Sequence, residues 1–246
     1  MTIDINKLSP NVLSNSRTLA PTVSHEARDA LDELIDPSTG VKEYRSAMLA
    51  LGEELGALVA KKMLNIMLNI SKQCLLVSTA EDADYLANGV SHALSETNIH
   101  YKNAVLWNNH YALKKGSVAP VIHSYMEPGY ESSNVLIVVK SVISGSCVVR
   151  TNILSLIDKI DPEKIFIVSP VMHEKSEMNL RNEFPNEIAD KFDFTFFAID
   201  RIKSEDGEVI PGIGGQVYQK LGLSDQPVKI GYLPDTVRRK IVSLSV

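Results

Sequence analysis

One segment combines residue types that can bind an anion. The apolar run V-L-I-V-V at 135–139 leads through Lys140 into Ser144, Gly145, Ser146 and Cys147, and a predicted helix follows. In such a turn, free backbone N–H groups and the positive end of the helix dipole can hold a phosphate group. The segment therefore predicts a phosphate-binding turn, although tight strand-to-helix turns without a ligand are at least as common.

Histidines are the next candidates for chemistry, because imidazole titrates near neutral pH. His110 and His123 lie in one polar stretch and are candidates for acid–base work, but surface histidines without a role are more frequent. His173 follows an apolar run and has Glu174 nearby, yet a metal site there needs more ligands than the sequence shows.

Nucleophilic chemistry has less support. Ser144 and Ser146 have no histidine and acid partners at a readable spacing, so we do not expect a serine nucleophile. Cys74 and Cys147 are far apart and form no C-x-x-C or Cys/His ligand pattern. We expect buried, reduced thiols at both positions, as is usual for free cysteine.

The elements that position these residues alternate along the chain. Short apolar runs predict strands at 75–77, 104–107, 135–139, 165–168 and 194–199. The stretches between them predict helices near 81–96, 146–159 and 175–190. Strands that alternate with helices form a mostly parallel sheet covered on both faces. Ligands of such sheets bind beyond the carboxyl ends of the strands.

Two helices are predicted before the first of these strands. The first spans 24–35, and a Pro-Ser-Thr-Gly break follows it. The second is the longest, with apolar residues from Tyr44 to Ile70 at three- and four-residue spacing. This apolar stripe is typical of a helix that packs against a core or a dimer partner.

Composition limits the class of protein. The chain has 246 residues, 44% of them hydrophobic, and a net charge of -5, which argues against a generic nucleic-acid-binding protein. It contains no apolar run of about 20 residues that would span a bilayer, and its N-terminus does not resemble a signal peptide. We therefore expect no membrane association and a cytoplasmic location.

Five segments, in order, resemble the uracil phosphoribosyltransferase family. They are P-S-T-G-V-K-E-Y-R at 37–45, C-L-L-V-S at 74–78, W-N-N-H-Y-A-L-K-K-G-S-V-A-P-V-I-H-S-Y-M-E-P at 107–128, V-L-I-V-V with its loop, and F-A-I-D through I-P-G-I-G-G at 197–215. The resemblance extends over about residues 38–222, some three quarters of the chain. It implies a type I phosphoribosyltransferase-like α/β fold, with a flap at 107–128 and a base-covering hood at 197–215.

The resemblance also implies a reaction and a set of site residues. Members of this family transfer phosphoribosyl from phosphoribosyl pyrophosphate to uracil and release pyrophosphate with the help of magnesium. The expected base-binding positions are Val209, Ile210 and Gly212 of the hood, where backbone groups read the uracil edge. The expected donor site contains Glu81, Lys140 and the turn from Ser144 to Cys147.

The donor site departs from the family pattern in several places. Glu81 occupies the position of an arginine that holds pyrophosphate, and Lys140 occupies the position of an acid. The turn Ser144–Cys147 replaces T-G-G-[ST], Asn108 and Asn109 lie near the flap arginine position, and Gly215 replaces an aspartate. We expect Glu81 and Lys140 to approach each other as an ion pair across the donor pocket. The alternative is that both are separate solvated charges, which would contribute little to stability.

Two functions follow from this comparison of residues. The first is a uracil phosphoribosyltransferase-like protein that has lost transfer and serves as a regulatory, structural or pyrimidine-nucleotide-sensing subunit, without a cofactor. The alternative is an active uracil phosphoribosyltransferase with an atypical donor site, which would use magnesium. The intact hood favours a pyrimidine over a purine in either case.

The expected organisation has three parts: an arm at 1–23, the phosphoribosyltransferase-like domain at 24–222 and a C-terminal extension at 223–246. Met48, Met63 and Met67 on the long helix are adaptable packing residues. We therefore expect a homodimer or a protein partner that binds partly through residues 41–70. A solvated charge run is the default interpretation of Arg238-Arg239-Lys240 in the extension.

Overall fold

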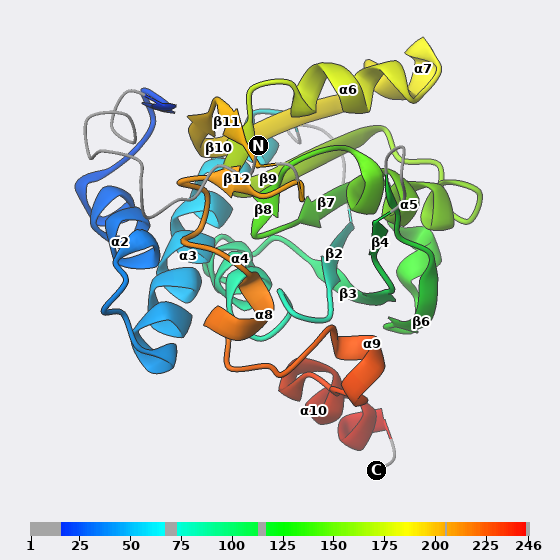
Figure 1. Cartoon of the computed structure of the whole chain (residues 1–246). Helices are drawn as coiled ribbons and strands as arrows, with labels where there is room; N and C mark the ends of the chain where they lie inside the picture. The colour runs from blue at the N-terminus through cyan, green and yellow to red at the C-terminus, as the bar shows by residue number, and fades with distance from the viewer. Residues whose placement is uncertain (1–15, 67–72, 113–116, 205, 245–246) are drawn as a thin grey trace.

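The computed structural model describes residues 16–66, 73–112, 117–204 and 206–244. Its centre is an eight-stranded sheet with helices on both faces (Figure 1), which confirms the expected fold class. The path of strands through the sheet is β1-β10-β9-β7-β2-β3-β6, and β8 pairs with β9 beside this path. Among the described residues, no helix is both long and apolar enough to cross a membrane.

The five predicted strands are the parallel strands in the middle of the sheet. They are β2 (Cys74–Thr79), β3 (Tyr101–Asn108), β7 (Val135–Val139), β9 (Lys164–His173) and β10 (Phe192–Asp200). Two antiparallel strands complete the edges, β1 (Arg17–Leu19) beside β10 and β6 (Val121–Met126) beside β3. All carboxyl ends of the parallel strands therefore meet at one edge of the sheet.

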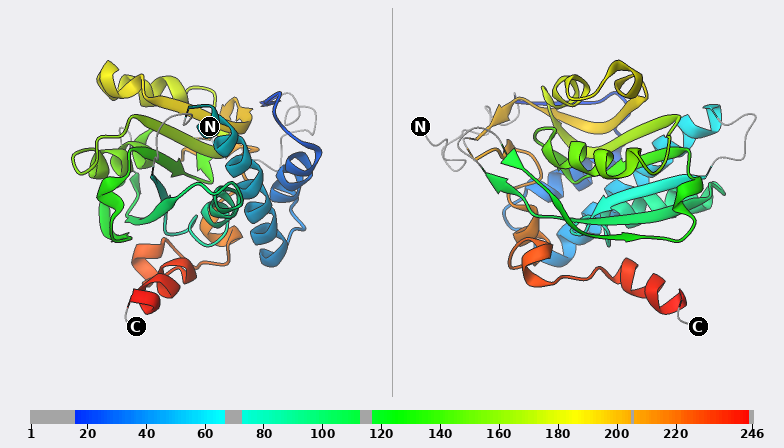
Figure 2. Two further views of the ribbon diagram at one scale, coloured as in Figure 1. Left: turned by 180° about the vertical axis from the view of Figure 1, so that it is seen from behind. Right: turned by 90° about the vertical axis from the view of Figure 1, so that its right-hand side faces the viewer.

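The sheet lies between two helical layers (Figure 2), and alternate residues of its buried strands pack against one layer or the other. Leu76, Ile137 and Phe166 pack with α2 (His25–Ile35), α3 (Val41–Ile66) and α4 (Leu86–Glu96). Leu75, Leu136 and Ile165 pack on the opposite face with α5 (Cys147–Ile157) and α6 (Ser176–Asn182). This two-sided burial explains why the strands are continuously apolar rather than alternating.

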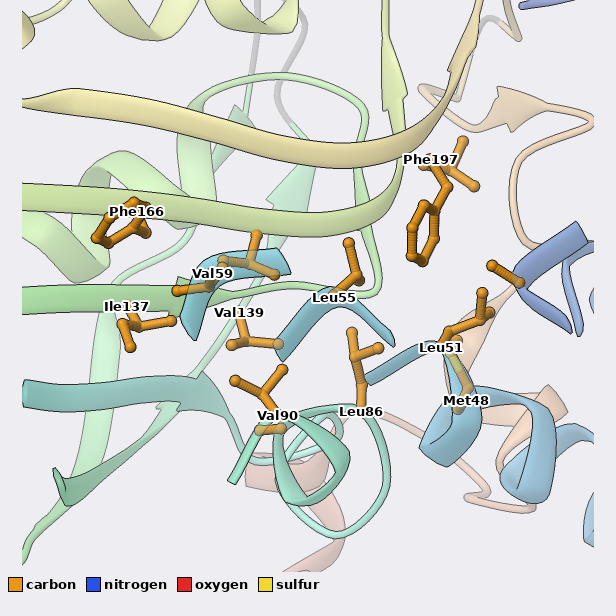
Figure 3. Close-up of a cluster of buried hydrophobic side chains, with 14 of the residues drawn as sticks. Met48, Leu51, Leu55, Val59, Leu86, Val90, Ile137, Val139, Phe166 and Phe197 are labelled. Atoms are coloured by element: carbon orange, nitrogen blue, oxygen red, sulfur yellow. The ribbon is translucent and has the colours of Figure 1, made fainter. Parts of the chain in front are cut away.

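The apolar stripe of α3 lies inside the protein's own core. Met48, Leu51, Leu55 and Val59 pack against α4 and the sheet, as Figure 3 shows. Met48 and Met63 are each 1% exposed, so the interface role expected for these two side chains is wrong, and Met67 lies outside the described residues. Assembly through residues 41–70 stays a prediction that these buried methionines do not support.

Close backbone contact fixes the position of α3 against α4. A Cβ atom on Gly52 would lie 2.1 Å from the Leu86 carbonyl oxygen, and one on Gly89 would lie 2.2 Å from that of Leu49. Real side chains do not tolerate such distances, so glycine at both positions allows the two helices to approach this closely. The contact holds α4, and with it the loop that precedes α4, in place beside the sheet.

Helix boundaries differ from the sequence prediction in two places. The helix expected from residue 81 begins at Leu86, because Asp82 and Asp84 place their carboxylates against other segments instead of continuing a helix. The helix expected over 175–190 is divided into α6 and α7 (Asn186–Ala189) by Pro185. Proline lacks the N–H that a continuous helix requires. The helix predicted at 24–35 is confirmed, with the Ser24 side chain accepting the Ala27 N–H as its N-cap.

The C-terminal extension folds onto the domain. It contains α9 (Pro227–Ile230), which contacts β3, and α10 (Asp235–Leu244), and both lie below the sheet in the view of Figure 1. The Trp107 indole N–H donates to the Tyr232 carbonyl oxygen over 2.8 Å, and Val237 of α10 packs against Trp107. The extension is therefore a packed part of the structure and not a free tail.

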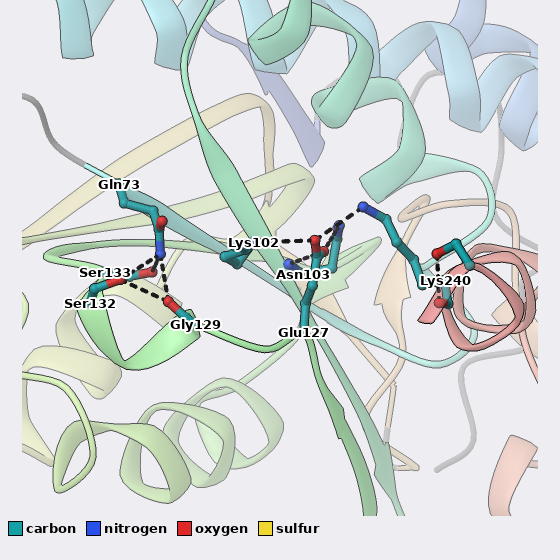
Figure 4. Close-up of polar contacts among 9 residues, drawn as sticks. Gln73, Lys102, Asn103, Glu127, Gly129, Ser132, Ser133 and Lys240 are labelled. Carbon is teal, nitrogen blue, oxygen red and sulfur yellow. Dashed lines mark hydrogen bonds and ion pairs between the residues drawn. The ribbon is translucent and has the colours of Figure 1, made fainter. Parts of the chain in front are cut away.

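A partly buried carboxylate, that of Glu127, also holds α10 (Figure 4). Glu127 accepts a hydrogen bond from the Asn103 side chain and lies 3.2 Å from the Lys240 ammonium. Burial alone would raise the pKa of Glu127, but the Asn103 hydrogen bond and the Lys240 charge outweigh burial and lower it. Because the folded-state pKa is lowered, this contact stabilises the fold at neutral pH, and the stabilisation is lost as the pH falls through the lowered value.

Asp84 is the main anchor of the extension. Its carboxylate accepts hydrogen bonds from the Tyr232 hydroxyl at 2.7 Å and from the backbone N–H groups of Asp235 at 2.9 Å and Thr236 at 2.8 Å. It thus acts as the N-cap of α10 from a segment about 150 residues away. This role was not predicted, because nothing near Asp84 in the sequence indicates α10 as its partner.

We expect Asp84→Ala to release α10 and to lower the free energy of unfolding by about 1–2 kcal/mol, as for loss of a helix cap. Limited trypsin digestion will then cut the extension faster than in the unchanged protein. Asp225→Ala is the matched control, because Asp225 is bonded within the extension, to Gln226 and Lys229. Equal digestion rates for the two variants would contradict the role of Asp84.

Candidate functional site

A pocket of about 780 Å³ lies at the carboxyl ends of the parallel strands. Three groups of residues line it: strand-end residues, the turn before α5 and the hood. They include Glu81, Asn108 and Lys140; Ser144, Gly145, Ser146 and Cys147; and Lys203, Val209 and Tyr218. A volume of this size is within the range of small-molecule sites and is sufficient for a nucleotide.

Glu81 and Lys140 meet at the floor of this pocket, so the predicted ion pair is confirmed. The Lys140 ammonium lies 3.1 Å from Glu81 Oε1 and 2.6 Å from Asp82 Oδ2. The three residues are 9%, 7% and 2% exposed, respectively. Two buried carboxylates thus surround one buried ammonium, and the local formal charge is negative.

Neighbouring donors complete this cluster. Asp82 Oδ2 also accepts the Thr79 hydroxyl at 2.9 Å and the Ser141 N–H at 3.2 Å, and the Lys140 ammonium donates to the Ser141 hydroxyl at 3.1 Å. Buried charges require such additional hydrogen bonds to offset the loss of water. Asp82 was not among the predicted site residues, although its position next to Glu81 was a usable signal.

Electrostatics keep Lys140 charged. Burial alone would lower the pKa of its ammonium, but the Asp82 and Glu81 carboxylates outweigh burial and raise the pKa above the ordinary lysine value. Burial, followed by the Lys140 charge, lowers the pKa of His110 in the same pocket. His110 is therefore neutral at pH 7 and adds no positive charge.

The turn before α5 has the geometry of an anion site. It begins after β8 (Val142–Ile143), and α5 has its first residue at Cys147. No acceptor among the described residues receives the backbone N–H groups of Ser144, Gly145 or Ser146. The Ser146 hydroxyl donates to Glu183, whose carboxylate also pairs with Arg150 at 2.8 Å.

Hydrogen bonds between segments that are distant in the sequence hold the hood in place. Its strands β11 (Ile202–Lys203) and β12 (Val209–Ile210) pair with each other, and α8 (Val217–Lys220) follows. The Gly212 N–H donates to Asp200 Oδ2 at 2.8 Å, and Arg17 pairs with both oxygens of the same carboxylate at 2.8 Å. Arg17 lies in the expected N-terminal arm, so β1 holds that part of the arm against the domain.

The predicted base-binding residues have different environments. Val209 lines the pocket, whereas Ile210 is 1% exposed and Gly212 is buried, and neither lines it. Gly212 has φ of +57°, and a Cβ there would lie 2.2 Å from the Val209 carbonyl oxygen, so the backbone requires glycine. Their role in base binding stays a prediction, with backbone groups of Val209 the best placed.

Other sequence candidates lie elsewhere. His123 is exposed on β6, and His173 Nδ1 accepts the Lys175 N–H at 3.2 Å; neither lines the pocket. Cys147 lines it as a half-buried thiol that donates to the Ser117 carbonyl oxygen, whereas Cys74 is fully buried. Lys203 and Asn108 line the pocket as well. Lys203 was missed because no local pattern indicates that the hood approaches the α5 turn.

The residues present do not fit a magnesium site. Magnesium prefers carboxylate oxygens in octahedral geometry, and the acids nearest the donor position, Glu81 and Asp82, are bonded to the Lys140 ammonium. Across the described residues, no group of three or more histidine, cysteine, aspartate or glutamate side chains is arranged to hold a metal ion.

Comparisons with known proteins show similarity in structure only. No protein-family model and no curated protein matches the sequence. AQ2163 protein from Aquifex aeolicus is 12% identical, with a TM-score of 0.62 over 82% of this chain and 97% of that one. Hypoxanthine-guanine phosphoribosyltransferase from L. donovani is 8% identical, with a TM-score of 0.43 over 61% and 76%. Adenine phosphoribosyltransferase from Thermoanaerobacter pseudethanolicus is 11% identical, with a TM-score of 0.35 over 61% and 83%.

At these identities the similarity concerns the fold alone. The described residues form an α/β fold with a mostly parallel sheet between helical layers, and β4 (Tyr111–Ala112), β5 (Ser117–Val118) and β6 lie in the segment predicted as the flap. This is the fold class predicted from the sequence. Of these three similar structures, two are named as a hypoxanthine-guanine and an adenine phosphoribosyltransferase, and the name of the third states no activity.

Proposed function

We propose that this protein binds a pyrimidine nucleotide in the pocket without catalysing phosphoribosyl transfer, and acts as a sensing or regulatory subunit. The observation that carries the proposal is the buried Lys140 ammonium held between Glu81 and Asp82. In a transferase, this part of the pocket would receive the pyrophosphate of the donor. Here it contains fixed carboxylates and a cation that they already neutralise.

Electrostatics oppose donor binding at this position. Glu81 and Asp82 share one ammonium, so one negative charge of the cluster is uncompensated. A pyrophosphate charge about 4 Å from it is repelled by roughly 4 kcal/mol at an effective dielectric constant of about 20. Stabilisation of the leaving pyrophosphate is the main task of such a site, and it depends on cations aimed at the developing charge. The loop after β2 instead presents Glu81 to the pocket and uses Asp84 to hold the C-terminal extension.

The other half of the pocket supports nucleotide binding. The turn before α5 keeps free N–H groups, and the hood keeps the Pro-Gly-Ile-Gly segment beside Val209. A phosphate on the turn and a base against the hood fit one nucleoside monophosphate in a pocket of about 780 Å³. The choice of a pyrimidine rests on the resemblance of the hood segment to uracil phosphoribosyltransferases.

The alternative function is an active uracil phosphoribosyltransferase with an atypical donor site. The open pocket that joins the α5 turn to the hood is the observation in its favour. This function requires the donor pyrophosphate to bind beside Glu81 and Asp82 or to displace them from Lys140. Removal of either carboxylate from a buried pair is costly, which is why we favour the non-catalytic function.

A direct assay distinguishes the two functions. We expect no UMP above the protein-free background when the purified protein is incubated with uracil, phosphoribosyl pyrophosphate and magnesium. Calorimetry in the same buffer will show UMP binding more tightly than AMP. An authentic uracil phosphoribosyltransferase serves as the positive control for the assay. UMP formation at an ordinary enzymatic rate, between about 1 and 1000 per second, would establish the alternative.

A further inference from the structure

Lys203 differs from the other cations that line the pocket. Lys140 pairs with Glu81 and Asp82, and Arg150 pairs with Glu183. Among the described residues, no carboxylate lies within ion-pair distance of Lys203; its ammonium donates to the Ser144 carbonyl oxygen at 2.8 Å. A neutral carbonyl does not balance its charge.

The Lys203 side chain is exposed to solvent, and its ammonium lies where a bound anion would be favourable. It lies over the α5 turn, 3.7 Å from where a Cβ on Gly145 would be. The N-terminus of α5 carries the positive end of the helix dipole, so a second positive charge there is repelled. Partial burial lowers the pKa of Lys203, as expected for a cation without a counter-charge. A bound anion would relieve both effects.

A second observation in the same pocket also indicates a ligand. Asn108 is 8% exposed and lines the pocket, and its amide nitrogen donates to the Asn152 side chain of α5 at 2.8 Å and to the Ala119 carbonyl oxygen at 2.9 Å. Its Oδ1 atom is buried and has no hydrogen-bond partner among the described residues. Buried acceptors without a partner are rare in folded proteins. Rotation of the Asn108 side chain toward the pocket would allow a ligand hydroxyl or N–H group to satisfy this atom.

We propose that Lys203 is a cationic clamp, supplied by the hood, for a ligand phosphate that binds the N–H groups of the α5 turn. The inference rests on the proposed function and names the residue that recognises the phosphate. Asn108 Oδ1 accepts a hydrogen bond from the sugar or base of the same ligand. The pocket therefore takes a phosphate ester with a hydrogen-bond donor, and Lys203 links the hood to the phosphate turn when this ligand is bound.

The acidic residues that line the pocket do not prevent an anion from binding beside Lys203. Glu81 shares the Lys140 ammonium with Asp82, and Glu183 pairs with Arg150. Glu208 contacts the Gln216 side chain, and Asp206 lines the pocket as an exposed residue. Burial, followed by the Asp206 charge, raises the pKa of Glu208 above its ordinary value. Lys203 and the α5 turn thus form the side of the pocket that favours binding of an anion.

The experiment compares UMP, AMP and uridine on three variants by calorimetry. Lys203→Ala is expected to weaken UMP binding by about ten- to a hundredfold, the effect of losing a charge-assisted hydrogen bond. It leaves uridine binding unchanged, because uridine has no phosphate. Lys203→Arg retains most of the UMP affinity. Lys159→Ala is the matched control, since Lys159 is exposed near the other end of α5 and does not line the pocket.

The outcomes separate the clamp from the proposed function. Equal UMP affinity in Lys203→Ala and Lys159→Ala overturns the clamp and leaves pyrimidine-nucleotide binding intact. Equal and Lys203-dependent binding of UMP and AMP supports the clamp and contradicts the preference for a pyrimidine. Absence of binding of both nucleotides to the unchanged protein overturns both proposals.

Discussion

Replacement of Lys140 by methionine is expected to lower the free energy of unfolding by about 3–5 kcal/mol. The substitution leaves the buried carboxylates of Glu81 and Asp82 next to each other with no cation between them. Their mutual repulsion and their loss of water both oppose folding. Urea denaturation followed by circular dichroism measures the change as a shift in midpoint at constant slope.

Lys62→Met is the matched control for this prediction. Lys62 also pairs with an aspartate, Asp193 at 2.7 Å, but the two side chains are 39% and 28% exposed. We expect a change of about 0–1 kcal/mol for this partly solvated pair. Combining Lys140→Met with Glu81→Gln and Asp82→Asn restores part of the lost stability, because it removes the unpaired charges. A stability of Lys140→Met equal to that of Lys62→Met would show that the buried cluster does not behave as an ion pair.

The second large effect is expected for Asp200→Ala. Asp200 is 0% exposed and accepts hydrogen bonds from two nitrogen atoms of Arg17 and from the Gly212 N–H. Its removal leaves the Arg17 guanidinium without its carboxylate and releases Gly212 of the hood. We expect a loss of about 3–5 kcal/mol in the free energy of unfolding, as for other broken buried pairs.

A local readout tests the structural reason for this effect. Hydrogen exchange of the backbone amides in β1 and in residues 209–214 is expected to become faster in Asp200→Ala, because the carboxylate connects these segments. Asp193→Ala, on the same strand, is the control; its carboxylate is 28% exposed, and we expect a change of about 0–1 kcal/mol. Unchanged exchange at 209–214 would show that the hood is held by other contacts.

Much of the fold could be predicted from the sequence because its signals are local. The apolar runs at 74–79 and 135–139 are buried on both faces, so burial favours a hydrophobic side chain at every position in them. The Ser24 cap and the α3 stripe likewise depend on residues a few positions apart. The positions of Glu81 and Lys140 followed from the ends of such strands, since parallel strands bring their carboxyl ends to one edge.

Tertiary structure alone decided what those local elements contact. The stripe of α3 is consistent with either a core or a dimer interface, and the packing against α4 and the sheet assigned Met48 and Met63 to the core. Arg17 and Asp200 are 183 residues apart, and Asp84 and Thr236 are 152 apart. Lys203 meets the α5 turn only because the hood folds over the strand ends. Hydrophobic periodicity is a property of neighbouring residues, whereas an ion pair or cap between loops depends on the path of the whole chain, which no local pattern encodes.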